Sequence, residues 1–203
     1  VVGESESGKS AALRLLMRQL AARYRPDEAR FVITDFRRSL MTAPSAYVSS
    51  YAATEARFTT DMASLAGLFA RRAPREDVSI QELRSRSWWQ GARAFVFIDD
   101  HDLVSSVAKN AFNELVPHLP YARDVGISFV VARNAAGVSR ALFDPFLQRM
   151  RDLGAQGLLL SGDPKEGEII GSVRARPLPP GRAVFATRRR SAPLVQLGWL
   201  PEE

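Results

Sequence analysis

A glycine-rich run of eight residues near the start of the chain constrains its fold more than any other feature. It matches the P-loop pattern G-x-x-x-x-G-K-[S/T] at every defined position, and its residues are Gly3, Glu4, Ser5, Glu6, Ser7, Gly8, Lys9 and Ser10. Such a loop turns successive backbone N–H groups towards phosphate oxygens, and the helix after it adds the positive end of its dipole. The run therefore predicts nucleotide binding, with Lys9 at the β- and γ-phosphates and the Ser10 hydroxyl on Mg²⁺. The competing interpretation is a turn rich in glycine and serine that binds nothing.

Helical and strand-like patterns alternate along the rest of the chain. Helical spacing of apolar residues, together with N-cap residues, predicts helices over 10–24, from Thr54 to just before Pro74, from Ser79 to before Trp88, over 107–119 and over 139–153. The run 31–33 predicts a short strand. Apolar runs without alternation predict strands buried on both faces at 94–98 and 127–132, and 158–160 predicts a third buried strand. Two strand-like runs follow at 183–187 and 194–200. This order predicts an α/β fold with a mostly parallel sheet flanked by helices and edge strands at the end.

The composition excludes several other classes. The chain has 203 residues, no cysteine and two histidines, which argues against a disulfide framework, a cysteine-ligated zinc site and a histidine-rich metal site. No apolar run reaches the roughly 18 residues that a membrane helix needs, and no signal peptide is visible. Only Val1 and Val2 precede the P-loop. We therefore expect residues 1–203 to be one ATPase domain, as a fragment of a longer protein.

An apolar strand that ends in two aspartates supplies the expected partner of the P-loop. Asp99 follows the run Phe95-Val96-Phe97-Ile98 and is predicted to hold Mg²⁺ through water, beside the γ-phosphate. Its alternative role is to cap the next turn. Asp100 stands where related ATPases often carry a glutamate that orients the attacking water. Because aspartate is one methylene shorter, Asp100 is either a catalytic base of reduced reach or a structural residue.

Three further places are candidates for function. Arg133 follows the next buried strand, where it is either a sensor of the γ-phosphate or a surface arginine at a strand end. Trp88 and Trp89 either contribute to an apolar substrate pocket or pack against the core. The weaker pocket candidates are Leu103-Val104 and Leu142-Phe143.

The formal net charge of +6 suggests an acidic partner such as nucleic acid. All but three of the 28 basic residues are arginines, and they are scattered; the one run is Arg188-Arg189-Arg190. Scattered charge is typical of a solvated surface, so nucleic acid is not the expected partner.

Several segments together resemble the FtsK/SpoIIIE class of P-loop ATPases and, within it, the last ATPase domain of the EccC family of ESX (type VII) secretion systems. The resemblance covers essentially the whole chain. The segments that carry it are GESESGKS at 3–10, YRPDEARFVITDFRRSL at 24–40, RSRSWWQG at 84–91, FVFIDDHDLV at 95–104, LPYARDVGISFVVAR at 119–133, the run from SRALFDP to GEIIG at 139–171, and RPLPPGRAVFATRR at 176–189.

This resemblance implies a RecA-like domain that binds ATP and Mg²⁺ within a longer, membrane-anchored protein at the cytoplasmic side of the cell membrane. It further implies that the domain recognises the C-terminal export signal of small helical-hairpin substrates of the WXG type. Its other partners would be the neighbouring ATPase domains of the same protein, and substrate binding would favour self-association.

Two departures from the family pattern bear on hydrolysis. The sensor strand ends in Ala132-Arg133-Asn134 rather than in a Thr-Gln-Arg-like sequence, and the acidic pair is Asp99-Asp100 rather than Asp-Glu. They favour tight ATP binding with slow turnover, and the sequence leaves open whether ATP is hydrolysed at all. Two other functions stay open, a DNA translocase domain of the same superfamily and a scaffold with a vestigial P-loop.

Overall fold

The computed structural model describes residues 1–141, 143–187 and 192–199. The predicted arginine run at 188–190, together with Leu142 and Leu200, lies outside the described residues. The α-helices are α1 Lys9–Arg23, α2 Glu55–Arg72, α3 Ile80–Ser85, α4 His101–Asn113, α5 Val138–Ala141 and α6 Pro145–Asp152, and the 3-10 helices are η1 Ser45–Tyr47, η2 Val116–Tyr121 and η3 Pro164–Glu166. The strands are β1 Val2–Gly3, β2 Ala29–Thr34, β3 Val48–Ala52, β4 Arg93–Ile98, β5 Ile127–Val131, β6 Arg133–Asn134, β7 Gly157–Leu159, β8 Glu168–Ile170, β9 Val173–Arg174, β10 Arg182–Ala186 and β11 Leu194–Gln196.

The two larger sheets meet at Ala132. One sheet has the order β3-β2-β4-β5 and is parallel throughout. The other has the order β11-β10-β7-β1-β6, in which β1 pairs in parallel with both β6 and β7. Only Ala132 separates β5 from β6, so one stretch of chain pairs with β4 by its first part and with β1 by its second. The α/β architecture with a mostly parallel sheet is therefore as predicted.

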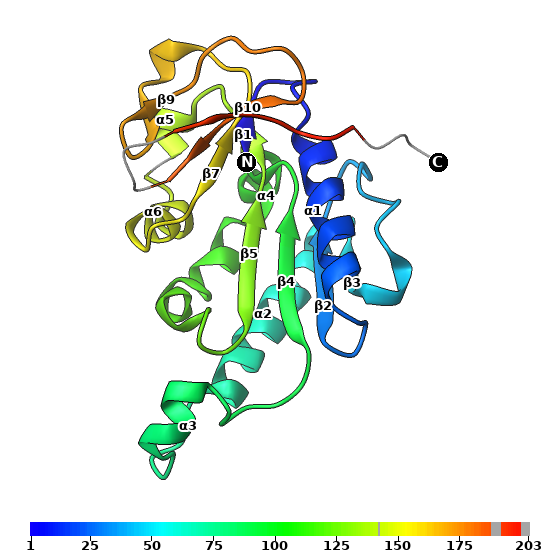
Figure 1. Ribbon diagram of the computed structural model, residues 1–203, viewed down its shortest axis with the longest axis vertical. Helices are drawn as coiled ribbons and strands as arrows, with labels where there is room; N and C mark the ends of the chain where they lie inside the picture. Colours follow the sequence, from blue (N-terminus) through cyan, green and yellow to red (C-terminus); the bar gives the residue numbers. More distant parts are fainter. Residues whose placement is uncertain (142, 188–191, 200–203) are drawn as a thin grey trace.

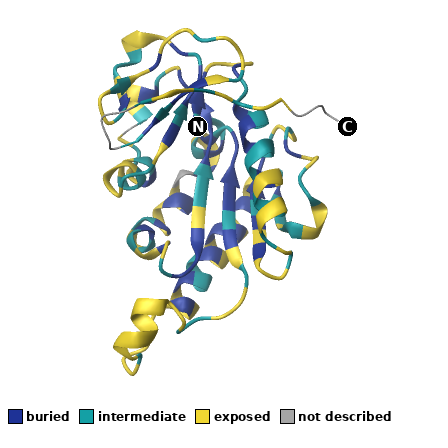
Figure 2. Ribbon diagram, viewed as in Figure 1, coloured by how far each residue is buried: buried dark blue, intermediate teal, exposed yellow. Residues whose placement is uncertain are grey.

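The central strands β2 and β4 are largely buried on both faces, which explains the lack of alternation in their apolar runs. The prediction of burial on both faces is only partly right for β5, where Ser128 is exposed and Phe129 and Val130 are half-buried. Phe31, Ile33 and Phe97 pack with α1 on one face of the sheet. Val96 and Ile98 point the other way and pack with α2 and α4. Figure 1 shows α1 in front of the sheet and α2 behind it, and Figure 2 shows that the buried residues concentrate on these strands.

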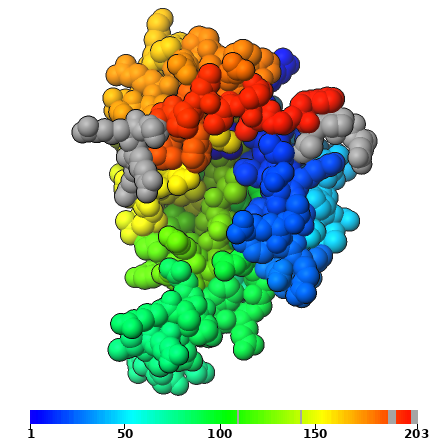
Figure 3. Space-filling model, viewed as in Figure 1, coloured from blue at the N-terminus to red at the C-terminus, as the bar shows by residue number. Residues whose placement is uncertain are grey.

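Antiparallel strands close one end of the sheet. β10 pairs antiparallel with β7, and β11 lies at the edge beside β10. A short hairpin of β8 and β9 adds Ile169 to the core under β7. At the other end of the molecule α3 projects from the body (Figure 3), and the residues of α3 are exposed. Among the described residues no helix is long and apolar enough to cross a membrane.

Predicted helix starts are confirmed where a capping side chain marks them. Thr54 caps α2 by accepting a hydrogen bond from the Arg57 amide. Ser79 and Glu82 cap α3 reciprocally, as a capping box requires.

Two predicted helices are wrong in their extent. The helix expected over 107–119 begins at His101 and ends at Asn113, with non-helical dihedral angles at Ala108, and a 3-10 helix containing Pro117 and Pro120 follows. The helix expected over 139–153 is broken into α5 and α6. Pro145 disfavours helical backbone at Asp144, and Asp144 instead caps α6 by accepting from the amides of Phe146 and Leu147. Strands β3, β8 and β9 were not expected.

Removal of the Phe97 ring should destabilise the fold strongly. Phe97 is fully buried and meets the Phe31 ring edge-on at 5.4 Å. We expect Phe97→Ala to lower the free energy of unfolding by about 3–5 kcal/mol, measured by urea denaturation. Val107→Ala, on a half-exposed side chain, is the control and should change it by less than about 0.5 kcal/mol. Equal effects of the two variants would contradict this assignment of the core.

Candidate nucleotide-binding site

The P-loop joins β1 to α1 at the carboxyl edge of the sheet. Gly8, with φ of 108°, is the N-cap of α1, so the first turn of the helix begins directly at Lys9. The Lys9 ammonium donates to the Glu4 carbonyl at 2.9 Å, and the Ser7 hydroxyl donates to the same carbonyl at 2.8 Å. The loop thus closes on itself and presents a lysine at the positive end of a 15-residue helix.

The two glycines of the motif serve different purposes. A side chain at Gly3 would meet the Ser7 hydroxyl and, at 2.7 Å, the Cβ of Leu160. Position 8 requires glycine for a different reason, because its backbone has a left-handed conformation. The outside of the loop is supported by Gly181, whose amide donates to the Ser7 carbonyl at 3.0 Å.

The Ser10 hydroxyl and the Asp99 carboxylate meet beside the loop. Ser10 donates to Asp99 Oδ2 at 2.7 Å, although 89 positions separate them in the sequence. Asp99 is 2% exposed. A hydroxyl and one buried carboxylate are hard oxygen ligands of the kind Mg²⁺ takes in nucleotide sites, where phosphates and water supply the rest. Consistent with that, the described residues hold no group of three or more acidic, histidine or cysteine side chains that could bind a metal alone.

Asp100 lies next to this pair in a strained conformation. Its backbone is left-handed, with φ of 46°, and its amide donates to Asp99 Oδ1 at 3.0 Å. Its carboxylate forms an ion pair with Arg37, with 2.9 Å between Oδ2 and Nε. Burial, and then the charge of Asp99, raise the pKa of Asp100, and Arg37 opposes that rise.

The loop after β2 contributes residues to the site that the sequence patterns did not single out. The Ser39 hydroxyl donates to Asp99 Oδ2 at 2.7 Å, the oxygen that Ser10 also contacts. Asp35 anchors the loop by accepting from the Leu40 amide at 2.7 Å and the Tyr51 hydroxyl at 2.6 Å. Asp35 directly follows a buried parallel strand, as Asp99 does, and that shared position was the signal available in the sequence.

Arg133 lies on β6 opposite Val2, directly beside the strand that leads into the P-loop. Its side chain is buried, and Nε donates to the Asn134 carbonyl at 3.0 Å. Burial lowers the pKa of Arg133, and the charges of Asp102, Asp144 and Glu166 oppose this. The charged groups that interact with Arg133 thus lie towards α4, α6 and η3. The role of Arg133 as a sensor stays a prediction.

His101 is a buried neighbour of this group and packs as an apolar ring. It contacts the ring of Phe112 and stacks on Phe146. Neither imidazole nitrogen has a hydrogen-bond partner within the described part of the chain. Burial lowers the pKa of His101 to about 4, so the ring is neutral at pH 7.

The two adjacent tryptophans fasten loops at the opposite edge of the sheet. Trp88 donates to the Arg72 carbonyl and Trp89 to the Asp124 carbonyl, each at 2.8 Å. The Arg72 guanidinium lies 4.2 Å above the Trp89 ring. Both indoles are half-buried, so the structure supports their packing role. Of the weaker pocket candidates, Val104 is in the core, Leu103 is half-buried and Phe143 is exposed.

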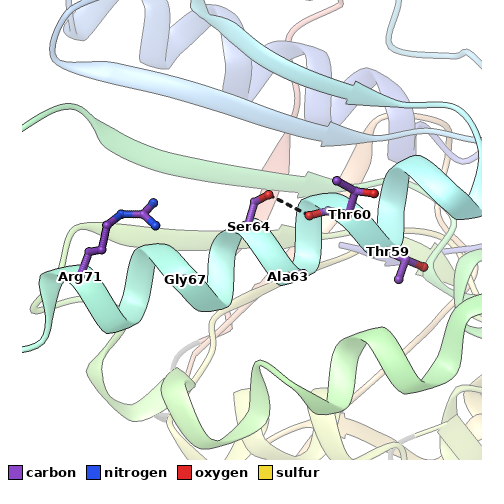
Figure 4. Close-up of a pocket in the computed structure, with 6 residues that line it drawn as sticks. All are labelled: Thr59, Thr60, Ala63, Ser64, Gly67 and Arg71. Atoms are coloured by element: carbon purple, nitrogen blue, oxygen red, sulfur yellow. Dashed lines mark hydrogen bonds between the residues drawn. The ribbon is translucent and has the colours of Figure 1, made fainter.

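An apolar cleft of about 830 Å³ opens between β5 and the segment that carries α6 and β7. Neither tryptophan lines it. Its lining is mainly apolar, with Leu119, Phe129, Leu147, Met150 and Ile170, and also includes three arginines, Arg123, Arg133 and Arg151. A second hollow lies on the exposed side of α2 (Figure 4) and is lined mainly by small and polar residues, among them Thr60, Ser64 and Gly67. Of these two hollows, the cleft is the one lined mainly by apolar residues.

Comparison with known proteins agrees with this site. The model of the FtsK/SpoIIIE family matches residues 1–88, which include the P-loop. The ESX-4 secretion system protein EccC4 of Mycobacterium tuberculosis is 43% identical over 202 residues, which cover 99% of this chain and 16% of that protein. Residues 1–88 thus match the FtsK/SpoIIIE family, and 99% of the chain is similar to an EccC protein.

The chain is also similar to an ESX secretion system protein EccC of Thermomonospora curvata, 36% identical over 98% of the chain and 15% of that protein. A solved structure of ATPases 2 and 3 of T. curvata EccC, in complex with a signal sequence peptide, superposes with a TM-score of 0.93 at 35% identity, over 99% of this chain and 36% of that one. The domain thus spans about a sixth of the length of the curated relatives that it matches.

A methyl group at Gly3 should disrupt the P-loop. We expect Gly3→Ala to destabilise the domain by about 1–3 kcal/mol, because its Cβ would overlap Ser7 and Leu160. Thermal unfolding is the measurement. Gly198→Ala is the matched control, since a Cβ at Gly198 meets no atom within 4 Å. Gly3→Ala unfolding at the temperature of the control would contradict the described loop geometry.

Proposed function

We propose that this chain is one ATPase module of a longer ESX (type VII) secretion ATPase, and that it binds Mg·ATP and turns it over slowly. The observation that carries the proposal is the meeting of Ser10 with Asp99 at 2.7 Å, beside Lys9 at the start of α1. The family match over residues 1–88 and the similarity to EccC along the whole chain support it. The chain spans 16% of EccC4, which agrees with a module of a longer protein.

Each part of the site has a distinct task in this proposal. The backbone amides of residues 5–8 and the N-terminus of α1 bind phosphate oxygens, whereas the Glu4 amide already donates to the Ser161 carbonyl at 2.8 Å. Lys9 exchanges its bond to the Glu4 carbonyl for the β- and γ-phosphates. Ser10 and Asp99 would hold Mg²⁺, which neutralises charge on the phosphates when bound. Asp99 is buried, and both of its carboxylate oxygens already accept hydrogen bonds. These bonds keep the carboxylate oriented.

Two features of the site favour slow turnover. Asp100 has a shorter side chain than glutamate, and about 1 Å of misplacement of an attacking water can reduce a rate on the order of 100-fold. Arg133, the candidate sensor, has its charged neighbours at Asp102, Asp144 and Glu166 rather than at the P-loop. Binding with slow hydrolysis suits a domain that works as a receptor and in assembly with neighbouring ATPase domains, at the cytoplasmic side of the membrane.

We further propose that the domain recognises the C-terminal signal of small WXG-type substrates. The solved T. curvata complex holds a signal sequence peptide on a pair of ATPase domains, one of which superposes on this chain. The cleft lined by Phe129, Leu147 and Met150 is the apolar surface that fits such a peptide.

Nucleotide binding is tested by titration calorimetry with Mg·ATP. Lys9→Ala should weaken binding by about 10- to 100-fold, the range expected when one charge-assisted contact is lost. Asp99→Asn should weaken binding of Mg·ATP but not of ATP in EDTA. Lys165→Ala, at an exposed lysine in η3, is the control and should bind as the wild type does. If the wild-type chain has no affinity for Mg·ATP, the result favours the scaffold function instead.

Substrate recognition is tested with a labelled peptide from the C-terminus of a WXG-type substrate. Met150→Glu places a charge in the cleft and should weaken peptide binding at least roughly tenfold, because a charged group is costly in an apolar site. Val107→Glu, at a half-exposed apolar side chain outside the cleft, is the control. Equal affinities of the two variants would place the peptide elsewhere.

A further inference from the structure

The loop after β2, residues 35–40, is fastened to both members of the acidic pair. Ser39 donates to Asp99, and Arg37 forms an ion pair with Asp100. The loop itself is held by the buried carboxylate of Asp35 and by Arg14, whose guanidinium donates to the Ser39 carbonyl at 3.0 Å. Arg37 therefore contacts Asp100 from a loop that is itself held in place.

The backbone of Asp100 is held in place independently of this ion pair. Its amide is bonded to Asp99, and its left-handed backbone follows directly from the end of β4. Its side chain is 16% exposed, whereas that of Arg37 is 64% exposed. The direction of the carboxylate is thus set by a partner that is largely in solvent, and a partner in solvent is released readily.

We propose that Arg37 is a positioning residue that restrains Asp100 and keeps hydrolysis slow; the inference rests on the proposed function of the domain. A carboxylate that orients an attacking water must direct an oxygen lone pair at that water. In this structure Asp100 directs Oδ2 at the Arg37 guanidinium, and the charge-assisted bond also withdraws electron density from that oxygen. Release of Arg37 frees the carboxylate for its catalytic orientation.

The test compares Arg37→Gln with Arg38→Gln in single-turnover ATP hydrolysis by the full chain. Arg38 is the next residue of the same loop and is also exposed, so the two variants lose the same charge. Arg37→Gln should raise the rate about two- to fivefold, the range that corresponds to loss of an exposed ion pair. Arg37→Lys, which keeps the cation, should stay near the wild-type rate, and Arg38→Gln should equal it.

Affinity and backbone exchange separate positioning from a general loosening of the loop. The affinity for Mg·ATP should be the same in all four proteins, so that only the rate constant changes. In the chain without nucleotide, the amides of residues 99–101 should exchange with deuterium faster in Arg37→Gln than in Arg38→Gln. Asp100→Asn added to Arg37→Gln should abolish the gain in rate, because the gain acts through Asp100.

An Arg37→Gln rate at or below that of the wild type, with Mg·ATP affinity retained, overturns the proposal. A rate below that of the wild type would mean that Arg37 assists the reaction. Failure of the wild-type chain to bind Mg·ATP overturns the proposed function instead. In that case the deuterium exchange comparison still decides whether Arg37 restrains Asp100.

Discussion

The site depends on one stretch of chain that pairs with two different neighbours. The Ala132 amide donates to Ile98 at the end of β4, and the next amide, of Arg133, donates to Val1 before the P-loop. The loop and the acidic pair come from distant parts of the sequence, and this pairing sets them one strand apart. A shift of two residues in either half would move the loop relative to Asp99 by about 7 Å, since a strand advances about 3.3 Å per residue. The short hydrogen bond from Ser10 to Asp99 thus depends on sheet register.

Much of the fold follows from local sequence patterns. An apolar run without alternation indicated β4, because that strand is buried on both faces by helices. A second such run indicated β5, which is buried less completely. Caps indicated α2 and α3 from side chains alone. The predictions were wrong around Pro117 and Pro145, where a proline redirects the chain and a 3-10 helix or a second helix replaces a long one. Short strands such as β3 escaped notice because Ser49 and Ser50 interrupt its apolar character.

The residues of the candidate site likewise divide into those that sequence patterns predicted and those whose contacts depend on the fold. The P-loop residues and Asp99 follow from a motif and from a strand that ends in acid, and the structure places them together. The contacts of Ser39 and Arg37 do not follow from any pattern, because they depend on how a loop bends after β2. Arg133 was singled out as a sensor or a surface arginine at a strand end. The structure buries it beside the P-loop strand, and its side-chain surroundings depend on α4, α6 and η3, which the fold brings there.

The bond between the Gly181 amide and the Ser7 carbonyl has a consequence for how the domain folds during synthesis. Leu197 in turn donates to Gly181, so a loop at the start of the chain is supported by two segments near its end. Its strand also needs partners at Arg133 and Leu159. Such contacts are distant in sequence, and contacts of that kind form late and slowly. Within this domain, the residues that are synthesised first therefore complete the nucleotide site among the last, after most of the domain has been synthesised.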